Sequence, residues 1–205
     1  MKNPLKIKYL IRWFNALDKP FWELAIPWIP FEATERLDKI LTKEMTVFEW
    51  GSGGSTLFFT KRVKKIISIE HNPEWYHRIL ELLKSSNILN CEYFLIELGP
   101  ASPDIPEEYR LAGRKKLGLD TREYVQMIDK YPDEYFNLVV VDGRQRPTCL
   151  NHALPKVRRG GYLLLDDHFD TDLPEKEWVK MVFVGPKPYT EGDRPLSPTT
   201  IWQKI

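Results

Sequence analysis

The sequence has few residues that could form a covalent or metal-linked framework. Its 205 residues include only two cysteines and four histidines. Cys91 and Cys149 lie far apart, each in an apolar setting, which is typical of reduced and buried thiols. The pattern therefore argues against a disulfide scaffold and against a cysteine-based metal framework.

The sequence also lacks an excess of charge of either sign. Thirty basic and 29 acidic residues give a formal net charge of +1. A strongly basic or acidic balance would point to a charged partner such as nucleic acid or an anionic membrane. Nothing in this composition calls for either.

No long hydrophobic run is present near the start of the chain. Met1 to Lys8 is basic, and the segment that follows is interrupted by Arg12 and Asp18. A secretory signal or a membrane-spanning helix needs a continuous apolar stretch. We therefore expect neither feature, and we expect a soluble cytoplasmic protein.

The length of the chain fits one domain with a substantial core. Residues 4–17 carry apolar side chains at helical spacing, with basic residues between them. We expect this helix to pack on the domain, with docking on a partner as the alternative. Residues 1–30 are thus predicted to form an N-terminal helical and aromatic extension, and residues 31–205 a single domain.

The remaining sequence alternates strand-like apolar runs with helical patterns. Strands are predicted at residues 46–50, 66–70, 91–96, 136–142 and 162–166, and helices at residues 31–41, 55–62, 72–86, 121–131 and 147–157. Alternation of this kind predicts an α/β domain with a parallel sheet. Two further runs, 179–184 and 199–203, have no helical pattern between them, which indicates an antiparallel pair at one edge.

The stretch Thr46 to Thr56 is a predicted strand that leads directly into a glycine-rich turn. Gly51, Gly53 and Gly54 permit a tight turn, and such a joint points backbone N–H groups and a positive helix end outward. Glu70 lies 19 positions after Gly51 and closes the next predicted strand. Its carboxylate is therefore expected beside the turn, where it can accept hydrogen bonds from ribose hydroxyls.

The order of these features resembles that of the class I S-adenosylmethionine-dependent methyltransferases. The resemblance covers about residues 31–205. It rests on Glu49 to Gly54 as the first motif, Glu70, Asp142 at the end of the fourth strand, and Gly160-Gly161 before the fifth. It implies a doubly wound, mostly parallel, seven-stranded Rossmann-like sheet with an antiparallel C-terminal hairpin.

The resemblance also implies which residues bind the cofactor S-adenosylmethionine. Glu70 would hold the ribose hydroxyls, and His71 would lie near the adenine edge. The full set of cofactor-binding residues that it implies is Glu49, Gly51, Ser52, Gly53, Ser55, Glu70, His71 and Asp142.

A nicotinamide dinucleotide is the alternative cofactor. The turn has the first two glycines of the dinucleotide fingerprint, but Thr56 stands where the third small residue belongs. Glu49 would lie badly near a pyrophosphate, whereas it suits a cofactor that carries an ammonium and a sulfonium. The methyl donor is therefore favoured over the dinucleotide.

Three carboxylates are expected at the carboxyl edge of the sheet, where open α/β sheets bind ligands. Asp142, Asp166 and Asp167 could together hold Mg²⁺ or another divalent cation. This pattern is similar to that of metal-dependent O-methyltransferases, in which the cation would lower the pKa of an acceptor hydroxyl. Alternatively, Asp142 holds the methionine ammonium or pairs with Arg144, and the other two aspartates cap backbone N–H groups.

Arg144 and Arg146 follow Asp142, and a second acid that is common there in the metal enzymes is absent. The two arginines could bind a carboxylate or phosphate of the acceptor by forked hydrogen bonds, or they could neutralise the acidic edge. Asp142 and His168 are the candidate catalytic residues. The ordinary pKa of histidine suits a general base, and a structural role is the alternative for His168.

Residues 99–120 form a long polar segment that is rich in proline and charge. Loops of this length inside a compact domain are usually functional or mobile. Together with Tyr109, Tyr124 and Tyr189, this segment is predicted to form a lid over the acceptor.

The favoured function is therefore methyl transfer from S-adenosylmethionine to an oxygen, less readily a nitrogen, of a small-molecule acceptor. Nucleic acid is not expected as a partner; the acceptor's identity and homo-oligomerisation are left open. The second hypothesis is a non-catalytic module that uses residues 13–31 as its partner surface. The third is an NAD(P)-dependent oxidoreductase.

Overall fold

The structure is a computed structural model, and it describes residues 7–17, 19–112, 118–167, 171–188 and 198–205. Within these residues no helix is long and apolar enough to cross a lipid bilayer. His168 and Tyr189, which the sequence marks as a candidate base and a lid residue, lie outside the described residues.

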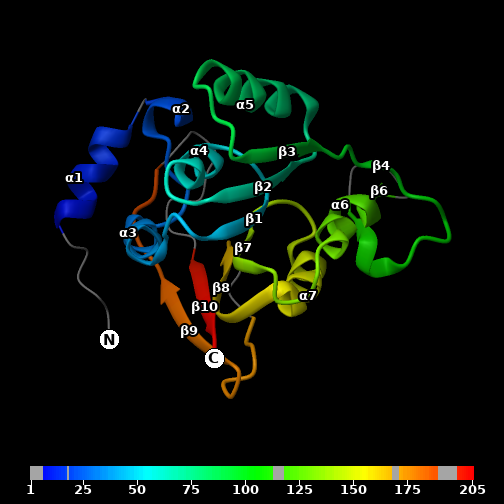
Figure 1. Cartoon of the computed structure of the whole chain (residues 1–205). Coiled ribbons are helices and arrows are strands. Elements are labelled where there is room, and N and C mark those ends of the chain that lie inside the picture. Colours follow the sequence, from blue (N-terminus) through cyan, green and yellow to red (C-terminus); the bar gives the residue numbers. More distant parts are fainter. Residues whose placement is uncertain (1–6, 18, 113–117, 168–170, 189–197) are drawn as a thin grey trace.

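A seven-stranded sheet forms the centre of the molecule (Figure 1). Its strand order is β3-β2-β1-β7-β8-β10-β9. The strands are β1 (Thr46–Trp50), β2 (Lys65–Glu70), β3 (Cys91–Leu95), β7 (Phe136–Val141), β8 (Val157–Asp166), β9 (Trp178–Phe183) and β10 (Thr199–Lys204). Neighbours from β3 to β8 pair in parallel, and β10 runs antiparallel to both β8 and β9. The predicted α/β class and antiparallel C-terminal pair are confirmed.

Helices cover both faces of the sheet. One face packs against α3 (Phe31–Ile40) and α4 (Gly54–Thr60), with α5 (Pro73–Ser85) beside β2 and β3. The other face packs against α6 (Arg122–Gln126), the 3-10 helix η2 (Met127–Lys130) and α7 (Arg146–Lys156). The central strands β1, β2 and β7 are therefore buried on both faces, which explains the nearly unbroken hydrophobic runs of the sequence there.

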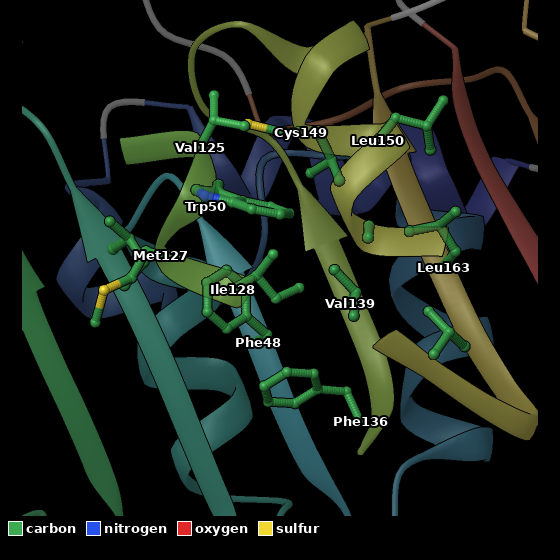
Figure 2. Packing of buried hydrophobic residues seen from close by; sticks show 14 of the residues in the cluster. Phe48, Trp50, Val125, Met127, Ile128, Phe136, Val139, Cys149, Leu150 and Leu163 are labelled. Carbon is green, nitrogen blue, oxygen red and sulfur yellow. The ribbon is translucent and has the colours of Figure 1, made fainter. Parts of the chain in front are cut away.

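Strand β1 divides its side chains between these two layers, because successive residues of a strand point to opposite faces. Val47 packs on the α3 and α4 side, whereas Phe48 and Trp50 pack on the α6 and α7 side. Figure 2 shows Phe48 between Trp50 and Phe136, with ring centroids 4.7 and 5.3 Å apart and edge-to-face geometry. The indole N–H of Trp50 donates to the backbone oxygen of Tyr124 at 2.9 Å, which fixes the start of α6 over the sheet.

The structure confirms one predicted element boundary and moves another. Helix α5 begins as expected: Pro73 is its first residue, and the side chain of Asn72 accepts from the backbone N–H of Trp75 at 3.0 Å. Strand β8, in contrast, begins at Val157 and runs through Gly160-Gly161, which were predicted to precede it as a turn. A Cβ on Gly161 would lie 2.8 Å from one backbone oxygen and 3.0 Å from another, so glycine allows the strand to pass there.

Within residues 99–112 and 118–120, the structure contains more secondary structure than the sequence indicates. They contain a small sheet of order β4-β6-β5, built from β4 (Gly99–Pro100), β5 (Arg110–Leu111) and β6 (Leu119–Asp120), and the 3-10 helix η1 (Glu107–Tyr109). The hydroxyl of Thr148 on α7 donates to the backbone oxygen of Glu108 at 2.6 Å. The side-chain amide of Gln145 donates to the same oxygen. These two contacts fasten η1 to the beginning of α7.

The N-terminal residues form α1 (Ile7–Ala16) and α2 (Phe21–Leu24), the second of which was not predicted within the aromatic connector. Helix α1 contacts α3 through one acid, because Lys8 and Arg12 both pair with Glu35, at 2.8 and 3.0 Å. Surface ion pairs of this kind add little stability. The buried residues Tyr9 and Ala16 supply the apolar part of the contact.

Candidate functional site

A cavity of about 350 Å³ opens where β1, β2 and β7 end. This volume falls within the usual range for small-ligand sites. The residues that line it come from the loops after these three strands and from the first turns of α5 and α7: Gly51, Ser52, Glu70, His71, Asn72, Trp75, Asp142, Gly143, Arg144 and Arg146. Seven of the residues that the sequence marks as cofactor, catalytic or acceptor candidates are therefore brought together.

Gly51 lets the loop after β1 approach the end of β7. Its φ is +89°, and a Cβ at this position would lie 2.9 Å from the backbone carbonyl of Asp142. Its N–H donates to the oxygen of Ile69 at 3.0 Å, which continues the parallel pairing of β1 and β2. Only glycine combines this left-handed conformation with such a close approach.

Glu70 lies directly beside this turn. Its Oε2 accepts from the backbone N–H of Ser52 at 3.2 Å and from the Ser52 hydroxyl at 2.9 Å. Its Oε1 accepts from the backbone N–H groups of His71 and Asn72, both at 2.8 Å. Burial alone raises the pKa of the Glu70 carboxyl, but the groups around it, His71 foremost, outweigh burial and hold the pKa below its ordinary value.

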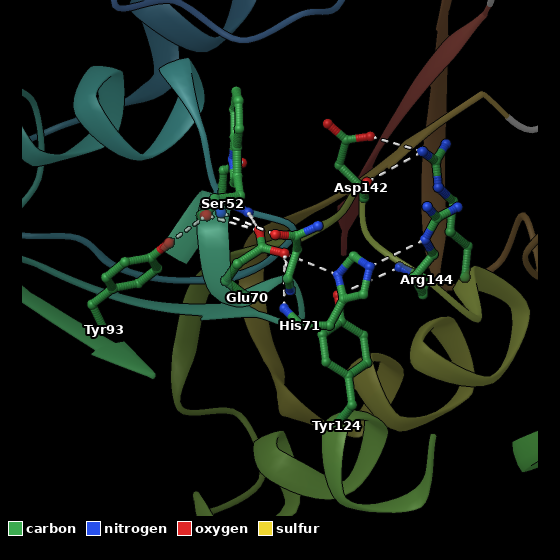
Figure 3. A network of polar contacts seen from close by, with 10 residues as sticks. Ser52, Glu70, His71, Tyr93, Tyr124, Asp142 and Arg144 are labelled. Carbon is green, nitrogen blue, oxygen red and sulfur yellow. Dashed lines mark hydrogen bonds and ion pairs between the residues drawn. The ribbon is translucent and has the colours of Figure 1, made fainter. Parts of the chain in front are cut away.

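His71 connects Glu70 to Arg144 across the cavity (Figure 3). The guanidinium Nε–H of Arg144 donates to Nε2 of His71 at 3.4 Å. Because an arginine can only donate, Nε2 is the acceptor nitrogen and the ring proton of the neutral form sits on Nδ1. That nitrogen lies 2.9 Å from Oε1 of Glu70. The ring of His71 also meets Tyr124 edge-on, at 6.0 Å between centroids.

Two aromatic residues that were not singled out from the sequence support Ser52. The indole N–H of Trp75 donates to the backbone oxygen of Ser52 at 2.8 Å. The hydroxyl of Tyr93 lies 2.7 Å from the hydroxyl of Ser52. Trp75 could have been expected, since it falls in the first turn of the helix that follows Glu70. No local signal in the sequence marks Tyr93, which reaches Ser52 from β3.

Tyr124 is a support residue and not a lid residue. It is fully buried below the cavity, and a Cβ on Gly143 would lie only 1.9 Å from its hydroxyl. The backbone N–H of Arg144 donates to this hydroxyl at 3.4 Å. Tyr109, the other described tyrosine of the predicted lid, lies 3.2 Å from Nε2 of His152 on the outer side of α7.

Asp142 lies at the end of β7, and Arg146 binds one of its two carboxylate oxygens. Oδ1 of Asp142 accepts from Nη2 of Arg146 at 3.0 Å. In the part of the chain that the structure describes, no residue donates to Oδ2, and Figure 3 shows this oxygen pointing away from the arginine. The predicted pairing with Arg144 is therefore wrong, because Arg146 takes that position.

The expected divalent metal site does not fit the geometry. Asp166 is buried and its carboxylate accepts from the hydroxyl of Thr199, while its backbone oxygen accepts from Arg146. Burial raises the pKa of Asp166 to about 6. Among the described residues, no three histidine, cysteine, aspartate or glutamate side chains are placed to hold a metal ion.

Three of the implied cofactor residues lie behind the cavity. Glu49 is fully buried, and its Oε2 accepts from the hydroxyls of Thr56 and Ser68, each at 2.7 Å. Burial raises its pKa to about 7. Gly53 and Ser55 begin α4 and are not among the residues that line the cavity. The strand alternation explains the position of Glu49, which points into the layer between the sheet and α4.

Comparisons with known proteins agree with this geometry. No protein-family model and no curated protein matches the sequence. A Streptococcus mutans structure, named as a candidate methyltransferase in complex with SAH, has a TM-score of 0.59 at 16% identity and covers 86% of this chain and 98% of its own. An rRNA methylase from Streptococcus thermophilus has a TM-score of 0.58 at 13% identity and covers 85% of this chain and 95% of its own.

A methyltransferase-like protein from Silicibacter pomeroyi has a TM-score of 0.51 at 22% identity and covers 84% of this chain and 85% of its own. Identities this low establish shared architecture and not shared substrates. The strand order, the glycine turn beside Glu70 and these likenesses agree. The chain has the fold of the class I S-adenosylmethionine-dependent methyltransferases.

Proposed function

We propose that this protein binds S-adenosylmethionine and transfers its methyl group to an acceptor. The observation that carries the proposal is the position of Glu70, whose carboxylate lines the cavity and contacts the turn that begins at Gly51. A paired acid and glycine turn at the ends of two neighbouring parallel strands form a nucleoside site in this class of fold.

The residues of the cavity fit the cofactor. The Glu70 carboxylate can accept hydrogen bonds from two ribose hydroxyls in place of those from Ser52. Gly51 and Gly143 let the loops after β1 and β7 lie against each other at the floor of the cavity, since a Cβ on either would clash with neighbouring protein atoms. His71 and Trp75 supply flat faces against which an adenine can pack.

Asp142 is the residue that we propose to face the acceptor. It lines the same cavity, and its Oδ2 is available to accept a hydrogen bond from an acceptor hydroxyl or amine. A carboxylate in that position orients the acceptor atom and takes up its proton. When bound, S-adenosylmethionine supplies a methyl group that its sulfonium makes reactive.

Arg144 suits an acceptor that carries an anionic group. The residue lines the cavity and its Nε–H is directed at His71, so the outer edge of the guanidinium is the part that can bind a ligand. Carboxylate and phosphate match that edge by forked hydrogen bonds. We therefore propose a small anionic molecule, methylated on oxygen more readily than on nitrogen.

A nucleic-acid acceptor is the second candidate, because one of the similar structures is named as an rRNA methylase. RNA binding depends steeply on salt, since it releases counterions from the phosphate backbone. The formal net charge of +1 favours the small molecule. Titration of a mixed RNA at rising salt separates the two, because a small-acceptor enzyme shows no salt-dependent RNA complex.

Calorimetry with S-adenosylhomocysteine, the demethylated cofactor, tests the proposal. We expect the intact protein to bind it and Glu70→Ala to weaken binding by roughly 2–4 kcal/mol, because two charge-assisted hydrogen bonds are lost. Glu107→Ala is the matched control, since that side chain is 88% exposed and away from the cavity. No detectable binding to the intact protein at millimolar ligand would disprove the function, as would dinucleotide binding in its place.

A further inference from the structure

Arg146 is surrounded by oxygen atoms of the two strands that end beside it. Its Nε donates to the backbone oxygen of Gly143 at 3.1 Å, and Nη2 donates to the backbone oxygen of Asp142 at 3.2 Å and to its Oδ1 at 3.0 Å. Its Nη1 donates to the backbone oxygen of Asp166 and lies 3.9 Å from Oδ2 of Asp167. The guanidinium thus joins the end of β7 to the end of β8.

The four hydrogen bonds among these contacts involve all three nitrogens of the side chain. A guanidinium has five N–H groups in a fixed fork, and acceptors of the protein lie along each of its three nitrogens. The side chain is 23% exposed. A substrate anion at Arg146 would have to displace the protein's own acceptors, so Arg146 cannot serve the role that Arg144 can.

A second cation lies beside Asp167. Lys187 is buried, and its Nζ lies 3.5 Å from Oδ1 of Asp167. A magnesium ion requires oxygen ligands in a tight octahedral shell at about 2.0–2.1 Å. Here the oxygens of Asp142 and Asp167 are instead separated by the guanidinium, and each carboxylate already has a positive partner.

We infer that Arg146 is a built-in cation in the place where a divalent metal would join Asp142 to the aspartates after β8. It acts as a positioning residue: it holds Oδ1 of Asp142 and leaves Oδ2 directed to the acceptor. The role of Arg146 toward the acceptor rests on the proposed function. Its role as a counter-charge to the aspartates does not depend on that function.

This arrangement restricts the chemistry of the acceptor. A bound metal ion orients an acceptor through the acceptor oxygens that it coordinates, and two neighbouring oxygens can chelate it. With the guanidinium in that place, one hydroxyl or amine that can donate to Asp142 is sufficient. The expected acceptor therefore needs no vicinal pair of oxygens.

Manganese binding, followed by electron paramagnetic resonance, tests the inference on the full chain. We expect the unaltered protein to bind no Mn²⁺ at millimolar metal and to keep its affinity for S-adenosylhomocysteine in EDTA. Arg146→Met removes the charge at similar volume and should increase Mn²⁺ affinity by roughly tenfold or more, because the acids lose a counter-charge. Arg144→Met, the matched control, should bind no more Mn²⁺ than the unaltered protein.

Arg146→Lys separates a charge role from a purely structural one. It keeps the positive charge and loses the fork, so it should still exclude Mn²⁺ while Arg146→Met does not. Micromolar Mn²⁺ binding by the unaltered protein, abolished by Asp142→Asn, would overturn the inference. Equal Mn²⁺ binding by the lysine and methionine variants would overturn it as well. Neither result would affect the binding of S-adenosylhomocysteine, which tests the proposed function separately.

Discussion

Ser52 donates twice to the same oxygen of Glu70, through its backbone N–H at 3.2 Å and its hydroxyl at 2.9 Å. Parallel pairing of β1 with β2 produces this contact, because Trp50 lies opposite Ile69 and the two chains leave the sheet side by side. The glycine turn and the acid that closes the next strand therefore form one unit. A ligand that binds Glu70 must exchange hydrogen bonds with Ser52.

Tyr93 determines how Ser52 presents its hydroxyl. The Ser52 hydroxyl proton is directed to Glu70, so the Tyr93 hydroxyl, 2.7 Å away, is the donor to Ser52. We expect Tyr93→Phe to weaken binding of S-adenosylhomocysteine by about 1 kcal/mol, or roughly fivefold, in calorimetry. Tyr135→Phe is the control, because that residue is partly exposed and stacks on Tyr131. Equal affinities for the two variants would contradict this role.

Gly51→Ala should damage both the turn and the site. The φ of +89° and the 2.9 Å approach to Asp142 leave no room for a methyl group. We expect a loss of about 1–3 kcal/mol in the free energy of unfolding, measured in urea, together with lost ligand binding. Gly99→Ala should have little effect on either, because a Cβ there meets no atom within 4 Å. An alanine variant at position 51 with normal stability would refute this explanation of the turn.

Glu49 should make the stability of the fold depend on pH. Its pKa is about 7 in the folded protein, raised by burial from the ordinary value of 4.5. Between these values the folded state keeps a proton that the unfolded chain releases, so the contribution of Glu49 to stability falls as pH rises. Glu49→Gln should therefore stabilise the protein by up to about 3 kcal/mol near pH 8 and hardly at all near pH 4. Denaturation of the unaltered protein and of Glu49→Gln between pH 4 and pH 8 measures the difference in the free energy of unfolding. A difference that does not change with pH would disprove this assignment of the Glu49 pKa.

The backbone oxygen of Glu108 accepts from both Thr148 and Gln145, and the Thr148 contact should slow the opening of residues 99–111. Thr148→Val removes the hydroxyl that donates to the Glu108 backbone at 2.6 Å. We expect amide hydrogen exchange in η1 to become roughly fivefold faster, for a loss of about 1 kcal/mol. Thr148→Ser keeps the hydroxyl and should restore slow exchange. Unchanged exchange in the valine variant would mean that other contacts hold the segment.

The sequence by itself determined the architecture and the half of the cavity around Gly51 and Glu70. Strand and helix periodicity are local properties, and so are the glycine turn and the Asn72-Pro73 helix start. The position of Glu70 follows from the same local information. A parallel strand pair has one geometry, so an acid at the end of β2 must lie beside the turn after β1.

Only the tertiary structure decided which charges meet at the ends of β7 and β8. Asp142, Arg144 and Arg146 are neighbours in the sequence, and nothing local says which arginine turns inward. The choice depends on the backbone oxygen of Asp166, which comes from a different strand.

The burial of Glu49 and the donation from Tyr93 to Ser52 also required the folded chain. Ser68 for Glu49 and Tyr93 for Ser52 are partners on other strands, and each pair meets only when the sheet has formed. Local pattern thus places the strand ends, whereas packing between elements selects the partner of each polar side chain.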